Sequence, residues 1–221
     1  MPPRRTWSFL LAAALTAGVV VVVHQWLRAP ALVAAVGGED ASRRAVVVYT
    51  PDPFYDLDAR VARGFAEGLS AHDWRALVMT TPAAHTHLPG VDYDLVALVA
   101  NTYNLAPDPQ LRRLVESGAI APGTGVVAIT LGAGSTRRSR AKLERLVREA
   151  DLALVGSREY WLFRPNDAGD TGGGAHLDPE ADSRRAFPVA APDSASVRRR
   201  NAAIAVRRAR EFGAEVAGRG E

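Results

Sequence analysis

The stretch from Tyr93 to Asn104 constrains the fold of this chain more than any other. Within it, Leu95 to Ala100 form an unbroken apolar run, which polar and aromatic residues follow. An apolar run this short is typical of a strand that is buried on both faces, as in the middle of a parallel sheet. Open α/β sheets bind their ligands at the carboxyl ends of such strands. The sequence therefore predicts a central strand here, with a candidate binding site where it ends.

Strand-like and helix-like segments alternate along the rest of the chain. Apolar or β-branched runs predict strands at residues 44–49, 74–79, 95–100, 124–131 and 152–155, and an extension of the last through 161–163 stays open. Apolar residues at helical spacing predict helices over 59–69, with Asp58 as N-cap, and over 109–116, 137–150 and 197–217. This alternation predicts an α/β domain with a five-stranded parallel sheet covered by helices on both faces.

The amino-terminal segment is long and apolar enough to interact with a membrane. The run from Trp7 to Val23 is free of charged residues, and His24 and Gln25 interrupt it. With Trp26 and Leu27 it reaches about the 20 residues that a membrane-spanning helix needs, and Trp7 and Trp26 lie near its ends as interfacial anchors. We expect residues 1–28 to be an uncleaved transmembrane anchor. A cleaved signal peptide, with Ala29-Pro30-Ala31 as the cleavage region, and a buried soluble helix are the alternatives.

The expected location is the cell membrane, as a single-pass protein. Arg4 and Arg5 favour a cytoplasmic amino terminus, but Arg28, Arg43 and Arg44 follow the apolar run closely enough to weaken that bias. The side on which the soluble domain lies therefore stays open. The predicted organisation is an anchor at 1–28, a linker at 29–42, a domain at 43–217 that contains a long irregular loop at 165–196, and a tail at 218–221.

Composition excludes several classes of chemistry. The chain has no cysteine, which rules out disulfides, thiol nucleophiles, iron–sulfur clusters and thiolate zinc sites. Its 27 basic residues include a single lysine, Lys142, and the formal net charge is only +3. Such an arginine bias reflects base composition better than a nucleic-acid surface, and no recognition motif accompanies it. We therefore expect no nucleic-acid partner.

With these elements in place, residues 44–217 resemble the flavodoxin-like family. The stretch Asp92-Tyr-Asp-Leu-Val and the later Asn101-Thr102-Tyr103 are similar to the family's aspartate–strand–(Ser/Thr)-Pro-x-Tyr segment. The segment Gly132-Ala133-Gly134-Ser135 falls where the family has its second flavin-facing loop, and Ala209-Arg-Glu-Phe-Gly213 is similar to its closing helix. The resemblance implies a three-layer α/β/α sandwich with strand order 2-1-3-4-5.

The resemblance also implies flavin mononucleotide (FMN) as cofactor and a role in electron transfer with a redox partner protein or a quinone. The flavin ring would lie between the loops at 101–106 and 132–136, with Tyr103 stacking on it and the neighbouring amides donating hydrogen bonds. The cofactor-binding residues that the resemblance implies are Thr50, Asn101, Thr102, Tyr103, Asn104, Gly132, Ala133, Gly134 and Ser135.

The loop after the first predicted strand departs from the family pattern. Flavodoxin-like proteins that hold FMN carry a Ser/Thr-x-Thr-Gly-x-Thr loop there, whose N–H groups and hydroxyls bind the phosphate. In this chain the loop from Tyr49 to Asp58 has no glycine, two prolines that cannot donate an N–H, and three aspartates that repel a phosphate. A flavin-free binding or scaffold domain therefore stays open, as does an enzyme such as a nicotinamide-dependent quinone reductase.

Other charged residues have simpler interpretations. His85 and His87 lack a third ligand and are expected on a surface loop, so no metal site is predicted. Solvated helix positions are the simpler interpretation of Arg137, Arg138 and Arg140, although such residues could attract an acidic redox partner. Turn and cap positions are the simpler interpretation of Asp52, Asp56 and Asp58, with a divalent cation as the alternative. No catalytic residues are predicted.

Overall fold

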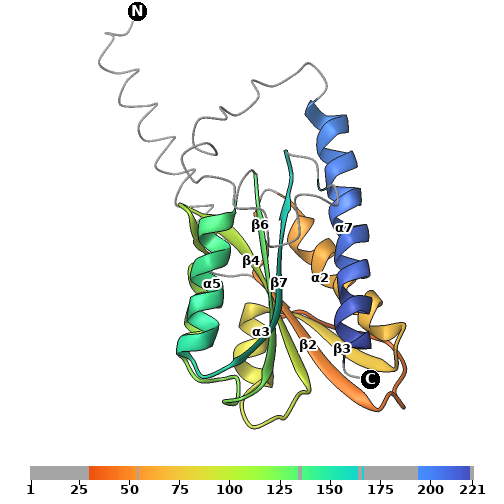
Figure 1. Cartoon of the computed structure of the whole chain (residues 1–221), viewed down its shortest axis with the longest axis vertical. Helices are drawn as coiled ribbons and strands as arrows, with labels where there is room; N and C mark the ends of the chain where they lie inside the picture. Colours follow the sequence, from red (N-terminus) through yellow and green to blue (C-terminus); the bar gives the residue numbers. More distant parts are fainter. Residues whose placement is uncertain (1–29, 54, 134–135, 164–165, 167–193, 220–221) are drawn as a thin grey trace, which may run out of the picture.

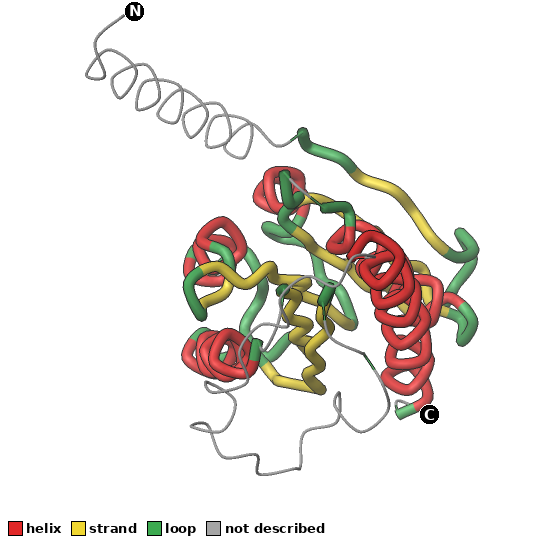
Figure 2. The backbone as a smooth tube through the Cα atoms, turned by 90° about the horizontal axis from the view of Figure 1, so that it is seen from above, coloured by secondary structure: helices red, strands yellow, loops and turns green. Residues whose placement is uncertain are grey.

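A computed structural model describes residues 30–53, 55–133, 136–163, 166 and 194–219. The strands are β1 (Val33–Val36), β2 (Arg43–Tyr49), β3 (Trp74–Thr80), β4 (Leu95–Tyr103), β5 (Ala106–Pro107), β6 (Gly125–Gly132) and β7 (Ala153–Trp161). The helices are α2 (Leu57–Ser70), α3 (Thr81–His87), α4 (Pro109–Glu116), α5 (Arg137–Glu149) and α7 (Ser194–Gly218). The strands form a central layer with helices on both sides (Figures 1 and 2).

The sheet has the order β1-β3-β2-β4-β6-β7, with β5 paired to β4. All neighbours from β3 to β7 in this order are parallel, which corresponds to the predicted order 2-1-3-4-5. The predicted count of five strands was too low, because β1 and β5 add antiparallel pairs to β3 and β4. Strand β1 lies inside the predicted linker at 29–42. It is mostly exposed and is held by main-chain pairing, so its sequence carries little apolar signal.

Strand β4 is the buried central strand that its sequence predicts. Leu95, Ala97 and Val99 pack in the apolar core on the side of α2 and α7. Their neighbours Val96, Leu98 and Ala100 pack in a second core beneath α3, α4 and α5. Alternate side chains of one strand thus fill both cores, which explains the unbroken apolar run.

Two helix boundaries and one helix differ from the prediction. Helix α2 begins at Leu57 with Asp56 at its N-cap, so the prediction of Asp58 as N-cap was wrong; Asp58 lies in the first turn and is buried. Helix α3 occupies residues predicted as a loop, because its short buried face of alanines gives little periodic signal. Helix α7 begins at Ser194, within the predicted loop at 165–196. Most of that loop lies outside the described residues.

The predicted anchor at residues 1–28 also lies outside the described residues. Among the helices that the structure describes, none is both long and apolar enough to cross a membrane.

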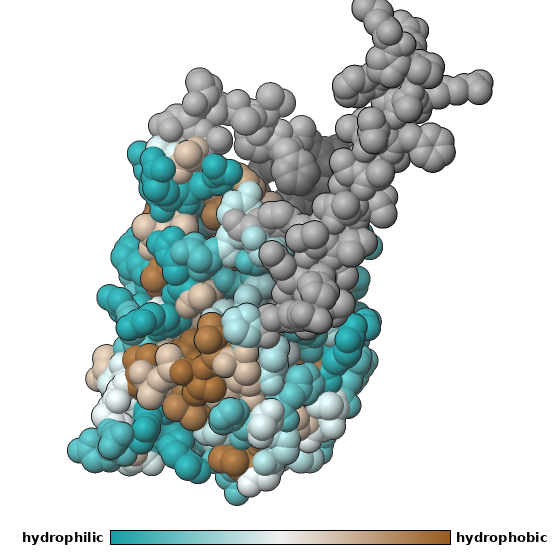
Figure 3. All heavy atoms as spheres, turned by 180° about the vertical axis from the view of Figure 1, so that it is seen from behind, coloured by the Kyte–Doolittle hydropathy of each residue, from teal (hydrophilic) through white to brown (hydrophobic). Residues whose placement is uncertain are grey.

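The face seen from behind carries an apolar patch among hydrophilic residues (Figure 3). Leu32 and Val33, beside the first described residues, are among the large apolar side chains that are exposed.

Candidate functional site

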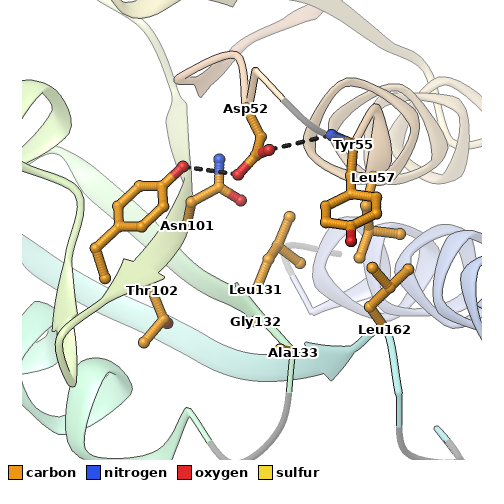
Figure 4. Close-up of a pocket in the computed structure, with 10 residues that line it drawn as sticks. Asp52, Tyr55, Leu57, Asn101, Thr102, Leu131, Gly132, Ala133 and Leu162 are labelled. Carbon is orange, nitrogen blue, oxygen red and sulfur yellow. Dashed lines mark hydrogen bonds between the residues drawn. The ribbon is translucent and has the colours of Figure 1, made fainter. Parts of the chain in front are cut away.

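A pocket of about 200 Å³ opens at the carboxyl ends of β4 and β6 (Figure 4). Its walls come from the β2–α2 loop, the start of α2, the ends of β4 and β6, and the residue after β7. The lining residues are Asp52, Tyr55, Leu57, Asn101, Thr102, Tyr103, Leu131, Gly132, Ala133 and Leu162. This is the edge of a parallel sheet at which α/β proteins bind their ligands. Its volume is below the roughly 300–1,000 Å³ of sites that enclose a whole drug-sized ligand.

Asp52 joins two walls of the pocket. One carboxylate oxygen accepts a hydrogen bond from the Tyr103 hydroxyl at 2.7 Å, and the other accepts from the backbone N–H of Tyr55 at 3.1 Å (Figure 4). Burial and the Asp52 carboxylate raise the pKa of Tyr103, so its hydroxyl stays protonated and donates. Tyr55 is 42% exposed and Tyr103 is 36% exposed, which leaves ring surface at the mouth of the pocket.

Asp58 lies behind this wall and is 2% exposed. Its carboxylate accepts hydrogen bonds from the backbone N–H groups of Asp52 at 2.5 Å and Ala59 at 2.7 Å, and from the Asn101 side chain at 3.2 Å. Burial raises the pKa of this carboxyl to about 7, although these hydrogen bonds oppose the rise. The carboxylate therefore uses N–H groups of the β2–α2 loop and of the first turn of α2.

Thr50, at the end of β2, is fully buried and does not line the pocket. Its hydroxyl donates to the Asp108 carboxylate at 2.7 Å and also lies 2.7 Å from the hydroxyl of Thr81. Asp108 is the N-cap of α4 and accepts from the backbone N–H of Leu111 at 2.9 Å. Burial raises the pKa of Asp108 to about 6. The hydroxyl of Thr50 is thus committed to the core.

Asn101 connects the central strand to this network. Its side-chain amide donates to the backbone carbonyl of Thr50 at 2.9 Å and to Asp58 at 3.2 Å. The amide nitrogen faces the β2–α2 loop, and the residue also lines the pocket. Its orientation is fixed by these two hydrogen bonds.

The opposite wall is mainly apolar. Leu131 and Leu162 contribute buried aliphatic surface, and Gly132 and Ala133 carry little or no side chain. The backbone N–H of Leu162 donates to the carbonyl of Gly132 at 2.9 Å, which holds these segments together. Within the described residues, the buried hydroxyl oxygen of Thr102 has no hydrogen-bond partner. Because side chains alternate along β4, this hydroxyl faces the side of α3, α4 and α5, away from the side chains of Asn101 and Tyr103.

Glu159 on β7 holds Thr136, the N-cap residue of α5. It is buried and accepts hydrogen bonds from both the backbone N–H and the hydroxyl of Thr136, at 3.2 and 2.7 Å. Two guanidinium nitrogens of Arg140 lie close to carboxylate oxygens, one 3.7 Å from Glu159 and the other 3.5 Å from Glu144. The expectation of a solvated Arg140 was therefore wrong, because its side chain is only 18% exposed and forms these ion pairs.

The structure brings together five of the nine cofactor residues that the sequence implied. Asn101, Thr102, Tyr103, Gly132 and Ala133 line one pocket, and their role toward a cofactor stays a prediction. Thr50 lies in the core and Asn104 in a turn with φ of 49°, neither of them on the lining. Gly134 and Ser135 lie outside the described residues.

Sequence reasoning did not assign the remaining lining residues to a ligand pocket. These are Asp52, Tyr55, Leu57, Leu131 and Leu162. The leucines are indistinguishable from core residues in sequence. Tyr55 could have been predicted as a lining residue, because it is an aromatic residue in the β2–α2 loop, at the edge of the sheet where α/β proteins bind their ligands. His85 and His87 lie on α3, and the described residues contain no group of three or more potential metal ligands.

The pocket fits one part of FMN and not the other. The apolar wall and the two tyrosines suit a planar ring. The β2–α2 loop, where a phosphate would need N–H donors and positive charge, presents the carboxylates of Asp52 and Asp58 instead. The residues present therefore fit a flavin ring and do not fit a phosphate at this loop.

Comparisons with known proteins support the fold. No family model matches the chain, and no curated protein matches it. Among solved structures, a flavodoxin from the domain Archaea is 12% identical with a TM-score of 0.51, and the match covers 80% of this chain and 97% of the other. A flavodiiron core from Synechocystis sp. is 11% identical with a TM-score of 0.53, covering 81% of this chain and 36% of the other. The domain therefore has a flavodoxin-like fold.

Proposed function

We propose that the domain binds the ring of a flavin in this pocket and takes part in electron transfer with a partner protein or a quinone. The observation that carries this proposal is the convergence of Thr102, Tyr103, Gly132 and Ala133 at the carboxyl edge of the sheet. Leu131 and Leu162 support it, because their buried side chains give the pocket an apolar wall against which a planar ring can pack. FMN is the flavin that the family resemblance implies.

Each wall has a defined task in this proposal. Tyr103, whose orientation Asp52 fixes at 2.7 Å, offers a face for stacking at the mouth. Leu131 and Leu162 exclude water from the inner edge of the ring, while Gly132 allows the main chain to approach it. A bound flavin supplies the electron and hydride transfer, and the protein orients it and sets its electrostatic surroundings.

Flavin fluorescence tests the proposal directly. Full-length protein in detergent should quench the fluorescence of lumiflavin, which is the ring without a ribityl chain. Ala133→Trp fills the pocket and should abolish the quenching, whereas Thr124→Val removes an exposed hydroxyl far from the lining and should leave it intact. A wild-type protein that quenches no flavin would overturn the proposal. Oxidation of a nicotinamide dinucleotide by the flavin-loaded protein would extend it to a reductase.

A flavin-free binding or scaffold domain is the second candidate. It is favoured by Asp58, whose carboxylate already accepts the hydrogen bonds of the Asp52 and Ala59 N–H groups. Fold does not determine function, so a domain with an internal anion here could have lost its cofactor. This candidate predicts no flavin affinity in the wild type, and none in Asp52→Asn or Asp58→Asn. Flavin affinity that appears only after these changes would identify a latent site instead.

The amino-terminal anchor remains a proposal from sequence. We propose that residues 1–28 hold the protein in the cell membrane as a single span, based on their length and their terminal tryptophans. The protein should then stay in the membrane fraction after an alkaline carbonate wash. Release into the supernatant would favour a cleaved signal. Protease access to the domain in intact and permeabilised cells would determine its side.

A further inference from the structure

The carboxylates beside the pocket carry an inference about which flavins it accepts. We infer that the site selects flavins whose side chain ends without a phosphate, and that it therefore prefers riboflavin to FMN. The reason is that the carboxylates of Asp52 and Asp58 occupy the β2–α2 loop, where a phosphate would have to bind. The inference rests on the proposed function. It concerns the chemical class of the ligand, and its basis is the geometry of Asp52 and Asp58.

The first argument is that Asp58 already engages two of the N–H donors that a phosphate could use here. Phosphate binds at helix N-termini because several N–H groups point to one place there. In the β2–α2 loop and the first turn of α2, the N–H groups of Asp52 and Ala59 both donate to the Asp58 carboxylate. Pro51 and Pro53 have no N–H to add. An internal carboxylate thus takes the hydrogen bonds that would otherwise hold an external anion.

The second argument is that the threonine hydroxyls near the loop are also bonded inside the core. Thr50 and Thr81 are fully buried or nearly so, and their hydroxyls lie 2.7 Å apart beneath the loop. The hydroxyl of Thr50 donates to Asp108, and that of Thr81 donates to the carbonyl of Tyr49. Neither lines the pocket. A phosphate could not recruit them without breaking the core network.

The third argument is charge. Asp52 lines the pocket, and Asp58 lies 3.2 Å from the amide of Asn101, another lining residue. No basic residue is among the described residues that line the pocket. Arg60 is the base nearest in sequence, and it lies 3.7 Å from Asp56 on the exposed side of α2. The carboxylates of Asp52 and Asp58 repel a phosphate dianion at this wall, whereas the hydroxyls of riboflavin could donate hydrogen bonds to them.

Parallel titrations test the inference with full-length protein in detergent. Lumiflavin, riboflavin and FMN are titrated at pH 8.5, where Asp58 and Asp108 are both ionised because their pKa values are about 7 and about 6. We expect riboflavin to bind about 10-fold more tightly than FMN, since one repulsive charge contact at low dielectric costs at least that much. Asp58→Asn keeps the side-chain shape and should reduce this ratio to about 3 or less.

Asp56→Asn is the matched control, because Asp56 lies in the same loop with its side chain 78% exposed. It should leave the ratio unchanged, and lumiflavin should bind all three proteins equally. If FMN binds as tightly as riboflavin, the inference is overturned while the proposed function stands. If the preference for riboflavin over FMN persists in both Asp58→Asn and Asp52→Asn, these carboxylates do not cause the preference and the inference is again overturned. If lumiflavin and riboflavin both fail to bind, the proposed function falls and the inference with it.

Discussion

The carboxylate of Asp58 accepts a hydrogen bond from the backbone N–H of Asp52 at 2.5 Å, in a place where only 2% of Asp58 is exposed. This contact closes the β2–α2 loop over the first turn of α2. It also keeps an ionisable group in the core, because burial raises the pKa of Asp58 to about 7. The loop is therefore coupled to pH through one side chain.

Asp58 should make the domain less stable as the pH rises from about 4 to about 7. Its folded pKa of about 7 exceeds the ordinary pKa of 3.8 for an aspartate side chain, so the native state binds more protons than the unfolded chain in this window. The free energy of unfolding must then fall with increasing pH and level off above pH 7. Urea unfolding at pH 5 and pH 8 should show a smaller difference for Asp58→Asn than for the wild type. At pH 8 the variant should be the more stable protein.

The exposed Asp56 provides the control for this experiment, because Asp56→Asn should retain the wild-type pH dependence. Asp108, with a folded pKa of about 6, contributes a second loss of stability between about pH 4 and 6 and explains a residual slope in Asp58→Asn. An unchanged pH dependence in Asp58→Asn would contradict the assignment.

Removing the hydroxyl of Thr50 should destabilise the domain from within. Thr50→Val keeps the shape but deprives the buried Asp108 carboxylate of a donor at 2.7 Å. Leaving a buried charged acceptor short of a partner costs about 1–3 kcal/mol. Thermal unfolding or urea titration at pH 8 measures the loss. Thr124→Val removes an exposed hydrogen bond to the carbonyl of Ala121 and should change stability much less. Equal losses in the two variants would refute a special role for the Thr50–Asp108 pair.

Sequence patterns identified the parts of the fold that depend on apolar burial. The run from Leu95 to Ala100 was diagnostic, because a strand that packs on both faces must be apolar at every position. Strand β1 was missed because its pairing with β3 uses main-chain groups, which every sequence possesses. Helix α3 was missed because it buries only small residues such as Ala83 and Ala84.

The pocket could be predicted on one side only. Thr102, Tyr103 and Gly132 end buried strands, so their place at the carboxyl edge follows from the topology. The acidic composition of the β2–α2 loop was visible in the sequence, but the contact of Asp58 with Asp52 was not. That contact depends on how the loop folds back over α2. From sequence alone, Asp58 could equally be an exposed N-cap residue.

Asn166 should stabilise the connection between β7 and α7. It is fully buried, and its side chain accepts from the N–H of Trp161 and donates to the Trp161 carbonyl, both at 2.8 Å, and to the carbonyl of Asn201 at 3.1 Å. Asn201 in turn donates to the carbonyl of Leu162, a pocket residue, at 3.2 Å. Asn166→Ala should cost about 1–3 kcal/mol, because it leaves buried main-chain groups without partners.

A double-mutant cycle with Asn201→Ala tests whether the two asparagines act together. Because they share one hydrogen-bond network, the double variant should lose less stability than the sum of the single variants. Hydrogen exchange at the Trp161 amide should also accelerate in Asn166→Ala. Strict additivity, with exchange at Trp161 unchanged, would contradict the network.

Helices α2 and α7 should separate if a methyl group is added between them. A Cβ on Gly68 would overlap the carbonyl oxygen of Arg210, and one on Gly213 would overlap the carbonyl oxygen of Phe65. Main-chain atoms cannot rotate away as a side chain can, so Gly68→Ala should cost about 1–3 kcal/mol or more despite the better helix propensity of alanine. Gly218→Ala adds the same methyl group in α7 with no atom within 4 Å and should be nearly neutral in the same urea titration. A neutral Gly68→Ala would mean that the two helices do not pack through their glycines.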